Sequence, residues 1–167
     1  KSVLEQTLQD FELIIIDNGS TDNSINLIEP FSKHKKILTI FQKNLGLNAA
    51  NNIALGRAKG KYIMRLDADD FLGLHALEVL SNALNRNPTI GLVFPDYYLA
   101  DEEGLVLQTV RRQDISKASL LDLPAHGACS MMRHECLLAL EGYDEAYNCQ
   151  DGWDLWLRFI ENYGVKN

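Results

Sequence analysis

The sequence predicts an α/β fold in which a mostly parallel sheet carries helices on both faces. Short apolar runs alternate with segments whose apolar residues recur at helical spacing, in the order β-α-β-α-β-α-β. The links are short, which implies parallel strands. In such sheets ligands bind beyond the carboxyl ends of the strands, so the residues that follow each strand are the first functional candidates.

Length and composition limit the class of protein. The chain of 167 residues has the length of one domain, 1–167, with room for a sizeable core. Its net charge of −7 argues against a nucleic-acid partner, whereas a bound cation could still attract a phosphorylated small ligand. No apolar run approaches membrane-spanning length, and no signal peptide opens the chain. Three cysteines without a CxxC pair favour a reducing compartment.

The first half of the chain contains the alternating elements. Runs dominated by Ile, Leu, Val and aromatic residues predict strands at 11–16, 37–41, 62–66 and 90–94. Helical spacing of apolar residues predicts a last helical turn at 2–8 and helices over 25–28, 47–54 and 74–84. Pro30 and Pro88 end two of these helices, and Gly60 closes a third.

The second half of the chain changes character. Two apolar runs around an acidic turn at 101–104 predict a hairpin over 96–108. A short apolar segment is expected at 129–132, followed by a helix that ends at Gly142. The last element is an amphipathic helix that carries Leu155, Trp156, Phe159, Ile160 and Tyr163.

An acidic cluster, Asp67, Asp69 and Asp70, follows the third strand directly. Like charges held this close repel, so they need a counter-cation or a specific task. Asp67 and Asp69 are two residues apart and project from the same side of an extended segment, where one divalent cation could bridge them to a phosphate. Asp70 alone could cap the next helix, but capping needs one such residue rather than three.

Polar residues also follow the first two strands. Asp17 ends the first strand, and Asn44 lies just beyond the second. Because the carboxyl ends of parallel strands meet at one edge of a sheet, both should approach the acidic cluster. Asp17 could instead simply start the Asn-Gly turn at 18–19.

Four stretches resemble motif blocks of glycosyltransferase family 2, which has the GT-A fold, in the family's order and spacing. They are Asp10–Ser24, Asn44–Gly46 with Ala49–Asn52, Leu66–Asp70 and Gln150–Arg158. The third is similar to the family's DxD motif, and the fourth to its acidic acceptor-side motif. The resemblance covers nearly the whole chain.

The resemblance implies a Rossmann-like GT-A domain that transfers a sugar, with inversion, from a nucleotide-sugar donor to a hydroxyl acceptor, assisted by Mn²⁺ or Mg²⁺. Donors with uridine are common in the family. By motif match, Asp17 contacts the nucleotide base, Asp67 the ribose or diphosphate, and Asp69 the metal. The matched stretches also contain the further donor-binding candidates Asn18, Gly19, Asn44, Gly46 and Asn52.

The catalytic base implied by the resemblance is an acidic residue of the last motif. The family's usual Glu-Asp pair stands here as Asp151-Gly152. Asp151 is the favoured base and Asp154 the alternative, because Asp154 is placed to begin or cap the final helix. Asn51 stands where the family often has Arg. The family's first strand would precede Lys1, so the chain is expected to be truncated at the N-terminus and possibly at the C-terminus.

The resemblance also implies a setting and leaves other activities open. It implies glycan or polysaccharide assembly on a saccharide or lipid-linked acceptor, in the cytoplasm or at the inner face of the membrane, with peripheral association. A sugar-phosphate nucleotidyltransferase would share the layout, but no Gly-rich, basic nucleotide loop is visible early in the chain. A catalytically inactive nucleotide-sugar-binding domain is the third reading. A calcium-binding loop fails at Phe71 and Leu72, which lack the oxygen ligand and the glycine that it needs.

Overall fold

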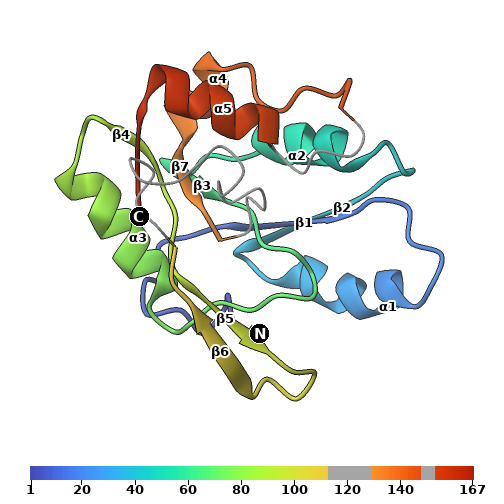
Figure 1. Cartoon of the computed structure of the whole chain (residues 1–167). Helices are drawn as coiled ribbons and strands as arrows, with labels where there is room; N and C mark the ends of the chain where they lie inside the picture. Colours follow the sequence, from blue (N-terminus) through green and yellow to red (C-terminus); the bar gives the residue numbers. More distant parts are fainter. Residues whose placement is uncertain (113–128, 148–152) are drawn as a thin grey trace.

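A computed structural model of the chain describes residues 1–112, 129–147 and 153–167 (Figure 1). The described helices and strands are, in chain order, β1 (Leu13–Asp17), α1 (Ser24–Ile28), the 3₁₀ helix η1 (Glu29–Lys33), β2 (Ile37–Phe41), α2 (Leu47–Leu55), β3 (Tyr62–Met64), α3 (Ala76–Arg86), β4 (Ile90–Val93), β5 (Tyr97–Ala100), β6 (Val106–Val110), β7 (Met131–Arg133), α4 (His134–Ala139), α5 (Trp153–Asn162) and β8 (Gly164–Lys166). The four strands predicted in the first half are confirmed, with bounds that shift by at most two residues at either end.

Strands β1 and β2 form a parallel pair, as predicted. Their register places Leu13 beside Ile37 and Asp17 beside Phe41, so both strands end at the same edge. The Glu12 side chain, just before β1, accepts hydrogen bonds from the backbone N–H groups of Lys59 (2.6 Å) and Gly60 (3.1 Å). This contact ties the start of β1 to the loop that leads into β3.

The second sheet is mixed, in the order β3-β7-β4-β8. Strands β3 and β4 both pair antiparallel with β7, so they run parallel to each other but are not neighbours. The two strands are thus parallel, as predicted, but an antiparallel strand that was not predicted lies between them. The apolar segment predicted near 129–132 supplies the intervening strand, because the side chains of Met131, Met132 and Arg133 are all buried. A three-residue segment carries no signal of its direction.

Helices cover both faces of the mixed sheet, as predicted. Successive residues of β4 point to opposite faces. Leu92 faces a core with Leu137 of α4 and Phe159 of α5, whereas Val93 faces a core with Leu84 of α3. Figure 1 shows α4 and α5 on one side of this sheet and α3 on the other. Among the described helices, none is both long and apolar enough to cross a membrane.

Two predicted boundaries are wrong. The predicted helical turn at 2–8 is a turn without a regular helix. Helix α2 ends at Leu55 with Gly56 as its C-cap, rather than at Gly60, because the chain must leave the helix early to reach β3. Pro30, in contrast, ends α1 as predicted and lies in the first turn of η1.

The cap of α3 comes from Gln6, not from Asp70. The helix begins at Ala76, with His75 as an N-cap residue that makes no side-chain cap hydrogen bond. Gln6 is 1% exposed; its Oε1 accepts a hydrogen bond from Leu77 N (3.0 Å), and its Nε2 donates one to Gly73 O (2.8 Å). The alternative reading of Asp70 as the cap of this helix is therefore wrong, since the cap reaches the helix from a distant part of the chain.

We expect Gln6→Leu to destabilise the fold by about 1–3 kcal/mol, because it removes the acceptor of the buried Leu77 N–H and one of the two hydrogen bonds to Gly73 O. The urea midpoint should fall while the slope of the transition is unchanged. A loss below about 0.5 kcal/mol, the range of ordinary surface substitutions, would contradict this role.

Candidate active site

Asp17 is a buried carboxylate at the end of β1, with 4% of its surface exposed. Its Oδ1 accepts hydrogen bonds from the backbone N–H groups of Gly19 and Ser20, both at 3.1 Å. The Ser20 side chain and these N–H groups lower the pKa of Asp17 below its usual value, against the opposing effect of burial. Its Oδ2 is buried and has no hydrogen-bond partner within the described residues. A buried acceptor without a partner marks a place where a ligand can donate a hydrogen bond.

The neighbouring Asn51 has a similar orphaned group. It lies on α2, which packs against β1. Its Nδ2 is buried and makes no hydrogen bond in the part of the chain that the structure describes. An unsatisfied donor and an unsatisfied acceptor therefore lie on two elements that are in contact. The sequence singled out Asn51 only as a departure from the family pattern.

Asn18 fastens the loop after β2 to the end of β1. Its Nδ2 donates to Gly46 O (3.1 Å) and to Asn44 Oδ1 (3.4 Å). Its Oδ1 accepts hydrogen bonds from Gln42 Nε2 (2.8 Å) and Leu45 N (3.2 Å). The structure thus brings the loops after β1 and β2 together through Asn18 and Asn44, whereas the expected approach of Asp17 and Asn44 to the acidic cluster after β3 stays a prediction.

Gly19 is required by the close approach of these two loops. It has a φ of +85°, and a Cβ atom built on it would lie 2.7 Å from Asn44 N. A side chain at this position would push the loops apart. Gly46 also has a positive φ, of +88°, and it precedes the first residue of α2. Both predicted donor-binding glycines therefore shape the loops around Asp17.

Asn52 uses its whole amide to hold another part of the chain. Its Nδ2 donates to Tyr143 O (2.8 Å) and Glu145 Oε1 (2.9 Å), and its Oδ1 accepts from Tyr143 N (2.9 Å). Asn48, one helical turn earlier, donates to Asp144 O (2.8 Å). Sequence reasoning missed Asn48, although the i, i+4 spacing of the two amides on one helix face was visible. Together they anchor the segment that leads into 148–152.

The acidic cluster divides into two kinds of carboxylate. Arg65 binds Asp67 through both side-chain oxygens, with Nη2 3.0 Å from Oδ2 and Nε 3.0 Å from Oδ1. Asp69 is exposed and makes no side-chain hydrogen bond or ion pair with the described residues. The protein itself supplies the counter-cation for Asp67, so Asp69 is the member of the pair that is left for a bound cation.

Cys129 lies beside the acidic cluster and was not expected there. Its backbone N–H donates to Arg65 O (3.0 Å), and its φ is +62°. Burial, followed by the negative charges of Asp70 and Asp67, raises the pKa of the Cys129 thiol to about 11. The group therefore remains a neutral thiol near pH 7, which makes it a poor nucleophile and a poor metal ligand.

Asp154, the alternative catalytic base, takes part in a hydrogen-bond network that joins α5 to the residues that follow α4. Its Oδ2 accepts hydrogen bonds from Arg158 Nε (2.9 Å) and Nη2 (2.6 Å). Arg158 also donates to Leu140 O (2.5 Å) and Gly142 O (2.9 Å), which follow α4. Asp151, the favoured base, lies outside the described residues, so its assignment stays a prediction.

Residues 1–137 match the family model described as glycosyl transferase family 2. The chain belongs to glycosyltransferase family 2. Chondroitin synthase of Escherichia coli is 29% identical over 163 residues, which cover 96% of this chain and 24% of the synthase. An uncharacterized glycosyltransferase of Methanocaldococcus jannaschii is 33% identical over 171 residues, which cover 97% of this chain and 58% of that protein. The chain thus spans between a quarter and somewhat over half of these relatives.

Solved structures confirm the predicted GT-A fold. Residues 1–349 of TarS from S. aureus superpose with a TM-score of 0.77 at 16% identity, covering 99% of this chain and 51% of that one. The mannosyltransferase PcManGT from Pyrobaculum calidifontis, solved in complex with GDP-Man and Mn²⁺, gives a TM-score of 0.72 at 19% identity and covers 99% and 48%. At these identities the likeness establishes the fold of this family 2 domain.

The donor set of the site suits a cation that shares its ligands with a phosphate. Within the described residues, no three His, Cys, Asp or Glu side chains lie close enough together to hold a metal ion by themselves. Mg²⁺ and similar ions are usually bound by one or two carboxylates together with substrate phosphates and water. A single free carboxylate, Asp69, beside the paired Asp67 fits that arrangement.

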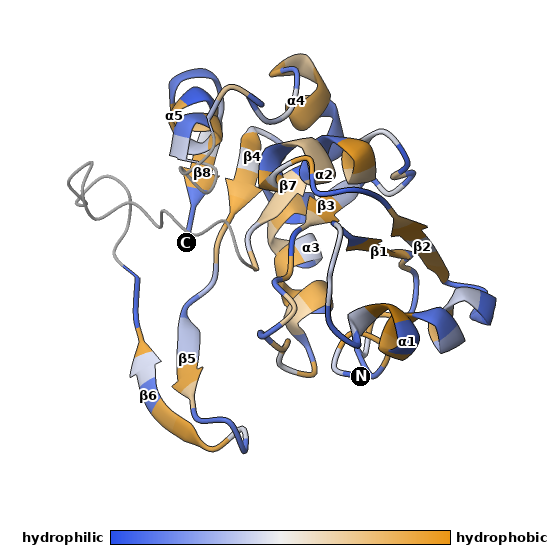
Figure 2. Ribbon diagram, turned by 90° about the vertical axis from the view of Figure 1, so that its right-hand side faces the viewer, coloured by the Kyte–Doolittle hydropathy of each residue, from blue (hydrophilic) through white to orange (hydrophobic). Residues whose placement is uncertain are grey.

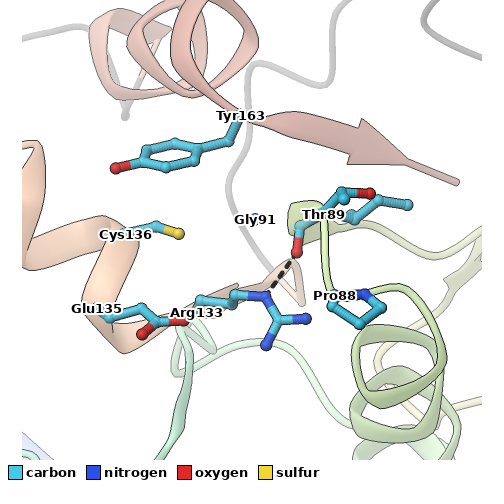
Figure 3. Close-up of a pocket in the computed structure, with 8 residues that line it drawn as sticks. Pro88, Thr89, Gly91, Arg133, Glu135, Cys136 and Tyr163 are labelled. Carbon is cyan, nitrogen blue, oxygen red and sulfur yellow. Dashed lines mark hydrogen bonds between the residues drawn. The ribbon is translucent and has the colours of Figure 1, made fainter.

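A separate cavity of about 450 Å³ opens at the start of β4, the end opposite the strand termini described above (Figure 3). Its lining residues are Pro88, Thr89, Ile90, Gly91, Arg133, Glu135, Cys136 and Tyr163. The Arg133 guanidinium donates to Ile90 O (2.7 Å), Leu84 O (2.7 Å) and Asn87 O (3.2 Å). Hydrogen bonds to backbone carbonyl groups at the end of α3 and in β4 therefore compensate the burial of this charge, which explains why a buried arginine is tolerated there.

The pH dependence of stability should report the hydrogen bonds of Asp17. Because the pKa of Asp17 is lowered below 3.8 in the folded chain, its contribution is present above that pH and is lost as the pH falls through the folded value. We expect Asp17→Asn to be less stable than the parent at pH 7, with a difference that shrinks towards pH 2. Urea unfolding across this range measures it, and a difference that is constant with pH would contradict the assignment.

Proposed function

We propose that this chain binds a nucleotide-sugar donor, with UDP as its nucleotide, and transfers the sugar to a hydroxyl acceptor with inversion at the anomeric carbon. The observation that carries the proposal is a pair of orphaned buried groups, Asp17 Oδ2 at the end of β1 and Asn51 Nδ2 on α2, which contacts β1. A nucleobase edge carries both N–H donors and carbonyl acceptors, so it can satisfy the two groups at once. Asn18, Gly19, Asn44 and Gly46 shape the loops around that base.

The acidic cluster would receive the diphosphate. Asp67, held in place by Arg65, contacts the ribose or diphosphate, while Asp69 binds Mn²⁺ or Mg²⁺. When bound, the metal neutralises the negative charge that grows on the leaving nucleoside diphosphate. Neighbouring structures whose complexes are with UDP-GlcNAc, or with GDP-Man and Mn²⁺, support this use of the fold.

The acceptor side is assigned to the last motif. Asp151 accepts the proton of the attacking hydroxyl, and the acceptor is a saccharide or a lipid-linked glycan in polysaccharide assembly on the cytoplasmic side of the membrane. Asn48 and Asn52 act as positioning residues, because they anchor the segment that leads towards Asp151. The similarity to chondroitin synthase supports a polysaccharide product.

A donor screen tests the proposal. UDP-, GDP-, ADP- and CMP-sugars would be titrated into the chain by calorimetry with and without Mn²⁺, and hydrolysis of each donor would be followed by release of the nucleotide. We expect metal-dependent binding and slow hydrolysis of a UDP-sugar. Release of pyrophosphate from a nucleoside triphosphate and a sugar phosphate would indicate a nucleotidyltransferase instead. Binding without any turnover, even with acceptors, would indicate an inactive binding domain.

A further inference from the structure

Apolar side chains of the hairpin β5–β6 are exposed in the described structure. Tyr98, Leu105 and Leu107 are 62%, 66% and 65% exposed, and Leu99 and Val106 are 45% and 48% exposed. Figure 2 shows the hairpin standing away from the rest of the described structure, with hydrophobic residues along both strands. A two-stranded hairpin of this kind is marginally stable alone, so it gains stability from a partner.

The outer strand of the hairpin has an edge that pairs with no other described strand. Strands β5 and β6 form a two-stranded sheet, and within the described residues β6 pairs only with β5. Figure 2 places β6 on the side of β5 that faces away from the body of the domain. A free edge with exposed apolar residues is a template for pairing with another strand.

Charge is distributed unevenly along the hairpin. The turn carries Asp101, Glu102 and Glu103, and the last two are exposed. The opposite end carries two arginines and one aspartate: Arg111 is exposed, whereas the backbone N–H of Arg112 donates to Asp96 Oδ1 (2.8 Å) and its guanidinium lies 4.9 Å from the centre of the Tyr97 ring. The hairpin is therefore acidic at its turn, the acidic tip, and basic at the opposite end of its strands, the basic end. The acidic tip disfavours a surface of anionic lipids as the partner.

We propose that β6 pairs antiparallel with β6 of a second copy of this chain, forming a two-fold dimer through a continuous four-stranded sheet. An antiparallel, two-fold arrangement places the acidic tip of each copy beside the basic end of the other copy, so opposite charges meet at both junctions. This charge complementarity favours a second copy over a neutral or acidic partner. The contact is small, so the dimer is weak and depends on concentration.

The sequence of β6 suits pairing about its own centre, Gln108. Val106 of one copy then lies opposite Val110 of the other, which joins two β-branched residues. In this arrangement the turn that carries Glu103 of one copy lies beside the end of β6 of the other copy, where Arg111 follows the strand, so these two long side chains of opposite charge can form an ion pair. The two-fold axis creates this ion pair twice.

Charge reversal tests the pairing on the chain itself. Glu103→Lys places two positive groups at each junction, and Arg111→Glu places two negative groups there. Sedimentation velocity over a range of concentrations should show a dissociation constant raised about tenfold in either variant. An equimolar mixture of the two variants should dimerise as well as the parent, because opposite charges meet again at both junctions. Circular dichroism checks that each variant is folded.

Three results would overturn the proposal. The parent chain could stay monomeric at every concentration, the dimer could survive in each single variant, or the mixture could fail to recover it. Nucleotide-sugar binding is expected to be the same in the parent and in both variants, since neither residue belongs to the candidate active site. The test is therefore independent of the proposed activity.

Discussion

Replacing Asp69 by Asn is expected to abolish the part of donor binding that depends on metal and to lower turnover by at least about 100-fold. The substitution keeps the size of the side chain and removes the charge of the carboxylate that has no partner among the described residues. A bound divalent ion contributes several kcal/mol to the stabilisation of charge in the transition state, and each 1.36 kcal/mol is about tenfold in rate. Calorimetry with and without Mn²⁺ measures the binding effect directly.

Two comparisons make the Asp69 result specific. Asp10→Asn makes the same chemical change at an exposed position before β1, at the opposite end of the strand, and should leave donor affinity unchanged. Asp67→Asn should weaken binding with and without metal, because it breaks the double contact with Arg65 and disturbs the loop. If Asp69→Asn bound the donor with unchanged affinity in Mn²⁺, the metal role of Asp69 would be wrong.

The elements that the sequence predicted well are those with a strong local pattern. β1 and β2 are short runs rich in Ile and Leu, and α3 repeats leucine every three or four residues, so each pattern is contained in a few neighbouring residues. β7 and β8 are three residues long, and their direction depends on which edges other strands leave open. Such choices are made by tertiary packing, which the local sequence does not encode.

The candidate site likewise contains residues whose positions the local sequence predicted and residues whose contacts depend on tertiary packing. Asp17, Asn44 and Asp69 became candidates because each follows a predicted strand, and ligands of such folds bind beyond strand ends. The sequence did not predict three structural contacts, those of Gln6 with α3, of Asn52 with Tyr143 and of Asp154 with Arg158. The sequence does not distinguish a side-chain amide that binds a ligand from one that holds a distant loop, because the residue type is the same in both cases. Only the fold decides between these uses.

The structure also changes how the catalytic base should be tested. Arg158 joins Asp154 to the carbonyl groups of Leu140 and Gly142, so Asp154→Asn should loosen the packing of α5 against α4. We therefore expect this variant to lower the urea midpoint and to reduce turnover only as far as the folded fraction falls. Arg158→Lys, which loses the planar fork, should reproduce the effect on stability.

Asp151→Asn is expected to have the opposite signature. It should leave the urea midpoint and the donor affinity close to those of the parent, while lowering sugar transfer by about 10²–10⁴-fold, the usual contribution of a general base. Near-full turnover in Asp151→Asn, together with a loss of transfer in a fully folded Asp154→Asn, would reverse the assignment.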